Sequence, residues 1–174
     1  MHRLWEIAVS LWFSNSLVIV HFSDNVLDVF QKSRQLKPWA KEAGGQLFCL
    51  FEEGKVLIEG ATRPGHGDKR SRYSFLPNRS KEQKDINGQF EQGLHYIGDW
   101  HTHPERIPNP SREDIRKMQA VYRESIHCLK YMILVIVGQE KLPTGLWVGY
   151  VSHNSVVGEA QLINAECYTG HGLR

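Results

Sequence analysis

The most informative stretch of this 174-residue chain is Gly98-Asp99-Trp100-His101-Thr102-His103-Pro104, followed by Pro110-Ser111-Arg112-Glu113-Asp114. The first part is typical of the end of a strand, which Pro104 terminates. The second part is typical of a helix that begins after a short loop. Side chains alternate across a strand, so His101 and His103 share one face while Trp100 and Thr102 point the other way. The two imidazoles can therefore reach a single metal ion.

Asp114 falls in the first turn of the predicted helix, where its carboxylate can supply an oxygen ligand to the same ion. Two nitrogens and one oxygen leave one tetrahedral position free for water, which is the arrangement of catalytic zinc sites. Each part also has an ordinary interpretation, because a His-x-His pair can be idle and Ser111-x-x-Asp114 resembles a helix capping box. The combination, with seven residues between His103 and Ser111 and two between Ser111 and Asp114, favours a zinc site in which Ser111 is both cap and catalytic group.

Hydrophobic patterning around this stretch predicts one mixed β-sheet with helices, in the α/β or α+β class. We expect strands at residues 17–22, 46–51, 56–58, 94–101, 131–137 and 146–151, and helices at residues 24–35, 80–92 and 111–127. The first helix, capped by Ser23, and the last helix each present an apolar stripe to the core: Val26, Leu27, Val29 and Phe30 in one, and Ile115, Met118, Tyr122 and Ile126 in the other. We expect residues 1–174 to form a single domain, with a core at 17–155 and a C-terminal tail at 156–174.

The composition is that of an ordinary folded domain, with 41% hydrophobic and 23% charged residues, and excludes disordered, collagen-like and coiled-coil chains. The net charge of +2 gives no indication of binding to nucleic acid or to an anionic membrane. The three cysteines (Cys49, Cys128 and Cys167) are widely spaced, form no disulfide framework and favour a reducing, cytoplasmic location. Residues 4–22 carry too many polar side chains to span a membrane, and residues 1–20 fit a first strand and its lead-in better than a secretory leader.

The pattern His101-Thr102-His103-Pro104, then Ser111-Arg112-Glu113-Asp114, resembles the JAMM motif of MPN/JAB-domain metallopeptidases. The predicted order of strands and helices from residue 17 to residue 151 agrees with the MPN fold. The resemblance implies one zinc ion per chain, held by His101, His103 and Asp114, and an upstream glutamate close to a glycine pair that opens a strand. Glu42, in Glu42-Ala43-Gly44-Gly45, fits that position, and the other candidates are Glu52, Glu53 and Glu59.

Shorter motifs resemble one bacterial branch of this family, the JAB peptidase encoded with ubiquitin-like conjugation enzymes in anti-phage CBASS operons. These motifs are Glu-x-Gly-Gly, the Arg63-Pro64-Gly65 loop and residues 99–104. The resemblance implies an isopeptidase that cleaves after the C-terminus of a conjugated protein whose extended tail is the substrate, with an E1/E2-like conjugation enzyme and a nucleotidyltransferase as partners. The alternatives are JAB branches that process sulfur carriers, phage-tail proteins or ubiquitin-like precursors, and an MPN scaffold without catalysis.

The residues support metal-assisted hydrolysis of an amide bond. Zinc lowers the pKa of its bound water towards about 7, Glu42 moves the water proton to the leaving amine, and Ser111 donates to the tetrahedral oxyanion. Asp99, on the histidine face of the strand, either orients an imidazole or faces solvent.

The basic loop at residues 63–72 is either a solvated surface or a border of the substrate groove. In the second case, charge reversal of Arg70 and Arg72 would raise KM more than it lowers kcat. The near-zero net charge disfavours nucleic-acid binding by this loop.

Overall fold

The computed structural model describes residues 7–13 and 16–163, and its main feature is a nine-stranded mixed sheet. Its strands are β1 (Ala8–Phe13), β2 (Ser16–Phe22), β3 (Gly44–Glu52), β4 (Lys55–Ala61), β7 (His95–Thr102), β8 (Tyr131–Val137), β9 (Leu146–Ser152), β10 (Val156–Glu159) and β11 (Gln161–Ile163). Their order across the sheet is β10-β9-β8-β7-β3-β4-β2-β1-β11. Because β10 and β11 are neighbours in the chain but lie at opposite ends of this order, the sheet must curl strongly. A separate short hairpin pairs β5 (Lys69–Arg70) with β6 (Phe75–Leu76).

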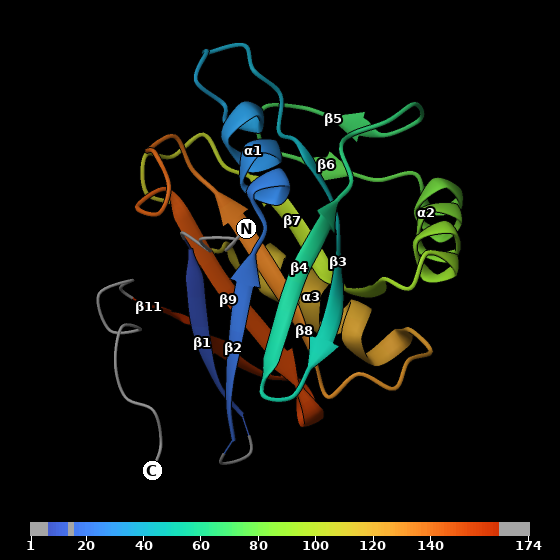
Figure 1. Ribbon diagram of the computed structural model, residues 1–174. Helices are drawn as coiled ribbons and strands as arrows, with labels where there is room; N and C mark the ends of the chain where they lie inside the picture. The colour runs from blue at the N-terminus through green and yellow to red at the C-terminus, as the bar shows by residue number, and fades with distance from the viewer. Residues whose placement is uncertain (1–6, 14–15, 164–174) are drawn as a thin grey trace.

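Three helices surround the sheet: α1 (Asp24–Ser33), α2 (Arg79–Glu91) and α3 (Arg112–Glu124). In Figure 1, α1 lies in front of the sheet, α3 lies behind it, and α2 stands to one side. A single turn of 3-10 helix, η1 (His153–Ser155), connects β9 to β10. This arrangement confirms the predicted class of a mixed sheet flanked by helices.

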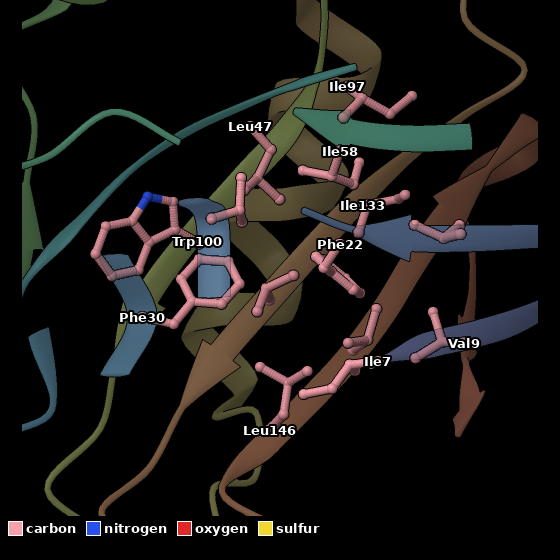
Figure 2. Packing of buried hydrophobic residues seen from close by; sticks show 14 of the residues in the cluster. Ile7, Val9, Phe22, Phe30, Leu47, Ile58, Ile97, Trp100, Ile133 and Leu146 are labelled. Carbon is pink, nitrogen blue, oxygen red and sulfur yellow. The ribbon is translucent and has the colours of Figure 1, made fainter. Parts of the chain in front are cut away.

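The predicted start and apolar face of α1 are confirmed. The Ser23 side chain accepts a hydrogen bond of 3.4 Å from the amide of Val26, which satisfies an N-terminal donor of the helix. The predicted apolar stripe is buried, and its Phe30 ring lies 5.2 Å from the Trp100 ring of β7 between ring centres (Figure 2). This packing fixes the strand that carries the two histidines against the helix in front of it.

The central strand β8 is buried along its whole length because both of its faces are covered. Ile133, Val135 and Val137 face the core that contains α1, whereas Met132, Leu134 and Ile136 pack against Met118 of α3. On the neighbouring β7, Trp100 belongs to the first core, so the alternate residues Asp99 and His101 face the α3 side. The site therefore forms between β7 and α3.

The last helix is shorter than predicted. It ends at Glu124, Ser125 adopts an extended backbone, and Ile126 is fully exposed instead of belonging to the core stripe. The reason is local, because the His127 ring hydrogen bonds to the Tyr122 carbonyl at 2.7 Å and to the Leu129 amide at 3.1 Å, which favours a turn over another helical turn. The other members of the stripe, Ile115, Met118 and Tyr122, do pack against the sheet.

The sheet extends beyond residues 17–155 at both ends. The sequence did not predict β1, which pairs with β2 and β11, and the predicted tail contributes β10 and β11. Residues 164–174, with Cys167, lie outside the described residues; the described Cys49 and Cys128 have free thiols. No helix within residues 7–13 and 16–163 combines the length and apolar character that crossing a bilayer requires.

Candidate metal centre and catalytic groove

The three predicted ligands lie together. His101 Nε2 is 3.2 Å from His103 Nε2 and 3.3 Å from Asp114 Oδ1, and His103 Nε2 is 3.3 Å from Asp114 Oδ2. The side chains are 12 to 13% exposed, so they are mostly shielded but reachable from one side. His101 lies in β7, His103 follows directly after the end of that strand, and the first turn of α3 supplies the carboxylate, as the spacing predicts.

The donor atoms are spaced as a metal ion requires. In a tetrahedral zinc site with bonds of about 2.0–2.1 Å, neighbouring ligand atoms lie about 3.3 Å apart. The observed separations of 3.2 and 3.3 Å match that triangle, although the carboxylate presents a different oxygen to each imidazole. The residues present therefore fit a divalent ion of the kind that binds nitrogen and oxygen together.

Ser111 holds the ligand carboxylate in place. Its backbone N–H and its hydroxyl each lie 2.7 Å from Asp114 Oδ2, and the hydroxyl oxygen accepts a 3.1 Å hydrogen bond from the Asp114 amide. The capping box is thus confirmed. The single hydroxyl proton is directed at Asp114 in this arrangement, so donation to an oxyanion requires the hydroxyl to rotate. The catalytic role of Ser111 stays a prediction.

Glu42 lies just before β3, opposite the histidine strand. Gly44 pairs with His101 in the β3–β7 register, and the amide of Thr102 donates to the Ala43 carbonyl at 2.8 Å, which places Glu42 near His103. The side chain is 6% exposed and lines the same groove as His101 and Asp114. The other candidates, Glu52, Glu53 and Glu59, do not line this groove.

The glycine pair that follows Glu42 opens β3, as predicted. A Cβ atom on Gly45 would lie 2.3 Å from the Thr62 carbonyl oxygen, which no side chain can tolerate. A Cβ atom on Gly44 would lie 2.6 Å from the Phe75 ring. The strand can therefore approach its neighbours closely only because both residues are glycine.

A buried polar network joins the glutamate segment to the histidine strand. The hydroxyl of Thr102 accepts from the amide of Ala43 at 2.9 Å and donates to Gln35 Oε1 at 2.8 Å. The Gln35 amide nitrogen in turn donates to the carbonyls of Ala40 and Arg72. Both Gln35 and Thr102 are 0% exposed. Each polar atom in this closed network has a partner, so the network rigidifies the site from behind.

The pKa values of two carboxyl groups in the site, Glu42 and Asp114, are shifted in opposite directions, and both shifts suit acid–base chemistry. Burial raises the pKa of Glu42 to about 7, with the charges of His103, Lys117 and Arg70 opposing the rise. Burial also favours a raised pKa at Asp114, but its hydrogen bonds with His101 and His103 outweigh that effect and hold the pKa well below its usual range. Asp114 is thus anionic, as a metal ligand must be, and Glu42 is suited to exchange a proton near neutral pH.

The two imidazoles differ in their surroundings. Burial lowers the pKa of His101, although Asp114 opposes this effect. At His103 burial acts in the same direction, but Asp114, Glu42 and Glu105 outweigh it and raise the pKa. His103 Nδ1 is buried and has no hydrogen-bond partner among the residues that the structure describes, where Glu105 Oε2 lies 3.9 Å from it. At this distance Glu105 favours the charged form of His103 but makes no hydrogen bond that fixes the ring.

A groove of about 480 Å³ runs from the ligands between β7, α3 and the β6–α2 segment. Its wall includes Phe75 and Pro77 on one side and Met118 and Val121 of α3 on the other. Asp99 lies in it but serves neither of the two roles considered above. It is partly buried and accepts a 3.0 Å hydrogen bond from the Tyr96 hydroxyl, not from an imidazole.

The arginines of the basic loop bind the protein's own backbone. Arg70 donates to the Glu42 and Lys41 carbonyls, and Arg72 donates to the Lys37 and Pro38 carbonyls. Both guanidiniums are thus engaged by backbone carbonyls, and neither arginine lines the groove beside the ligands, so the structure gives no support to the predicted KM effect of Arg70 and Arg72. The sequence did not predict that Gln35 and Thr102 support the site, because no pattern in a single sequence shows which polar side chains meet inside a fold.

The sequence is similar to a known protein family and to several of its members. A sequence profile described as prokaryotic homologs of the JAB domain matches residues 26–148. The chain is 33% identical over 141 residues to the "CD-NTase/cGAS isopeptidase" of Pseudomonas aeruginosa (strain BWHPSA011 / Pa011), covering 77% of this chain and 87% of that protein. It is 30% identical over 125 residues to the "Probable metalloprotease y4qB" of Sinorhizobium fredii (strain NBRC 101917 / NGR234), covering 68% of this chain and 76% of that protein.

The fold also resembles a solved structure. The solution structure of protein DSY2949 from Desulfitobacterium hafniense superposes with a TM-score of 0.59 at 18% identity, covering 87% of this chain and 98% of that one. At this identity the likeness concerns the fold alone. The family profile, in contrast, covers the segments that carry Glu42, both histidines and Asp114, since the matched residues 26–148 include all four.

Proposed function

The chain belongs to the family of prokaryotic homologs of the JAB domain, and from this premise we propose that it is a zinc-dependent isopeptidase that releases a conjugated protein. The observation that supports this most is the triangle of His101, His103 and Asp114 donor atoms at 3.2 and 3.3 Å, with the buried Glu42 lining the same groove. A scaffold would have no need to keep three ligands and a buried carboxylate together, so we favour catalysis over the alternative of an interaction module.

In this proposal His101, His103 and Asp114 are the residues that would hold one zinc ion, since their Nε2 atoms and carboxylate oxygens face one another. When bound, zinc supplies Lewis-acid polarisation of the scissile carbonyl and an acidified water. The contribution of the chain begins with Ser111, whose backbone N–H and hydroxyl keep the carboxylate aimed at the ligand position. Asp114 donates no proton in the reaction, because its low pKa keeps it ionised.

Glu42 accepts the proton of the attacking water and delivers it to the leaving amine. Its pKa of about 7 suits both halves of this task, because the group can bind and release a proton near neutral pH. Rotation of the Ser111 hydroxyl from Asp114 Oδ2 towards the substrate would let it donate to the developing oxyanion. The residues thus divide into a ligand set, a proton carrier and a hydrogen-bond donor.

The substrate we propose is a protein whose extended C-terminal tail is joined by an amide to a lysine or a short peptide. The relative from Pseudomonas aeruginosa is named an isopeptidase of CD-NTase/cGAS, which makes a conjugated nucleotidyltransferase of an anti-phage CBASS system the first candidate. The groove beside the ligands, about 480 Å³ and open to solvent, suits an extended chain. We further propose that an E1/E2-like enzyme makes this conjugate. Conjugation and release would both take place in the cytoplasm.

The test is cleavage of such a conjugate, prepared with purified E1/E2-like conjugation enzymes and followed by gel and mass spectrometry. We expect the wild-type protein to release both partners, a zinc chelator to stop the reaction, and added zinc to restore it. Bound zinc without cleavage of isopeptide- or peptide-linked substrates would contradict the proposal and favour the scaffold.

A further inference from the structure

The β5–β6 hairpin holds the backbone of Glu42 from both sides. The Glu42 N–H donates a 2.7 Å hydrogen bond to the Ser71 carbonyl, and the Glu42 carbonyl accepts a 2.6 Å hydrogen bond from Arg70 Nε. The same guanidinium donates through Nη2 to the Lys41 carbonyl at 3.3 Å. Two consecutive carbonyls therefore share one planar fork, which a single point charge cannot reproduce.

The hairpin that carries Arg70 is itself anchored. Its turn is closed by a hydrogen bond of 2.9 Å from the Ser71 amide to the Ser74 carbonyl and by a 2.7 Å contact between the two serine hydroxyls. The Phe75 ring sits where a side chain on Gly44 would otherwise be. The hairpin therefore contacts the Glu42 segment at two points. Arg70 hydrogen bonds to the Glu42 carbonyl, and the Phe75 ring packs at Gly44, two residues later.

From these contacts we infer that Arg70 is a positioning residue for Glu42, fixing the backbone from which the proton-carrying carboxylate projects. The inference rests on the proposed function, because it assigns Glu42 its role there. Glu42 lies in a loop just before β3, where no strand pairing holds residue 42 itself. Arg70 and Ser71 supply the hydrogen bonds that a neighbouring strand would otherwise supply.

This assignment makes a different prediction from a substrate contact. A positioning residue acts on the chemical step, so its loss lowers kcat while KM changes little. A groove-lining cation acts on binding, so its loss raises KM. Lys69 is the matched control, since it is the exposed neighbour of Arg70 in β5, has the same charge, and its side chain makes no hydrogen bond or ion pair with the described residues.

The kinetic test uses the zinc-loaded full chain and a purified conjugate. We expect Arg70→Ala to lower kcat by about 10- to 100-fold, as misplacement of a catalytic group does, with KM and zinc content close to wild type. Arg70→Lys should recover only a small part of the loss, because an ammonium cannot serve both carbonyls at once. Lys69→Ala should retain kcat and KM. A raised KM with unchanged kcat in Arg70→Ala, or equal losses in Lys69→Ala, would overturn the inference.

Amide hydrogen exchange tests the same inference without any substrate. In Arg70→Ala the Glu42 amide should exchange about 10-fold faster than in wild type, since the segment loses hydrogen bonds from a charged group. The His103 amide, which donates to the Val137 carbonyl of β8 at 2.9 Å, serves as the internal reference and should not change. Unchanged exchange at Glu42 would refute the positioning role. A wild-type protein that cleaves no conjugate would refute the proposed function and leave this result standing.

Discussion

The amide of Ala43 donates a 2.9 Å hydrogen bond to the hydroxyl of Thr102, which ties the residue after Glu42 to the residue between the two histidines. Thr102 returns a second bond through its own amide to the Ala43 carbonyl. The spacing between the proton carrier and the metal ligands is therefore set by hydrogen bonds that join the segment entering β3 to the end of β7, rather than by flexible side chains. Sites built on such rigid elements hold their geometry more accurately than sites built on loops alone.

Thr102→Val tests this link. The substitution keeps the shape but leaves the buried Ala43 N–H without its acceptor and Gln35 Oε1 without its donor. We expect the free energy of unfolding to fall by about 1–3 kcal/mol and kcat to fall with it. Urea denaturation measures the first quantity. Thr102→Ser keeps the hydroxyl and should lose less than Thr102→Val; equal losses would show that the methyl group, not the hydroxyl, matters.

Gly98→Ala tests how closely β7 approaches β8. At Gly98 φ is +152°, and a Cβ atom would lie 1.8 Å from the Ile133 carbonyl oxygen. We therefore expect a loss of about 3 kcal/mol or more in the free energy of unfolding. The control is Gly88→Ala in α2, where a Cβ atom would meet nothing within 4 Å. Because alanine favours the helix more than glycine does, this substitution should raise the free energy of unfolding by about 0.5–1 kcal/mol. A mild Gly98→Ala would contradict the strand packing.

The sequence predicted those parts of the fold in which a local pattern has one physical solution. The continuous apolar run of β8 requires cover on both faces, and Ser23 followed by Val26, Leu27, Val29 and Phe30 specifies both the start and the buried face of α1. The alternation that places His101 and His103 on one face is equally local. These residues were predictable because strand and helix periodicities are properties of short segments.

The parts that were missed depend on partners far away in the chain. β11 is a strand because it pairs with β1, although more than 140 residues separate the two. The early end of α3 is an exception with a local cause: Ile126 follows the helical period, but the His127 ring hydrogen bonds to the Tyr122 carbonyl and the helix ends before Ile126. Arg70 looked like a free surface cation, since only the fold brings the Glu42 carbonyl to it.

His21→Gln tests a pH dependence of stability outside the catalytic site. Burial, together with the nearby Lys55 charge, lowers the pKa of His21 below its ordinary 6.5, and Glu52 opposes this effect. The folded state thus binds this proton less readily than the unfolded state, so the wild type loses stability as pH falls below 6.5. The variant lacks this loss. The difference in free energy of unfolding should shift in favour of the variant between about pH 7 and about pH 5; a constant difference would contradict the shift.

Metal analysis tests the ligand set separately from catalysis. We expect about one zinc ion per wild-type chain, and nearly none in His101→Ala or Asp114→Ala, since two remaining ligands bind zinc poorly. Glu42→Gln should keep its zinc, because Glu42 is assigned to proton transfer and not to coordination. Elemental analysis of the purified, dialysed proteins measures all four. Equal zinc in His101→Ala and wild type would show that the site lies elsewhere.

Hydrolysis of the conjugate's amide bond with Glu42 as the proton carrier is tested most directly by the masses of the products. Zinc-loaded wild type and zinc-loaded Glu42→Gln are compared on one purified conjugate. We expect wild type to yield a conjugated protein with its complete C-terminus and a partner with a free amine, one water having been added across the amide. We expect Glu42→Gln, folded and with the same zinc content, to yield neither. Cleavage inside the tail, or wild-type turnover by Glu42→Gln, would contradict this expectation.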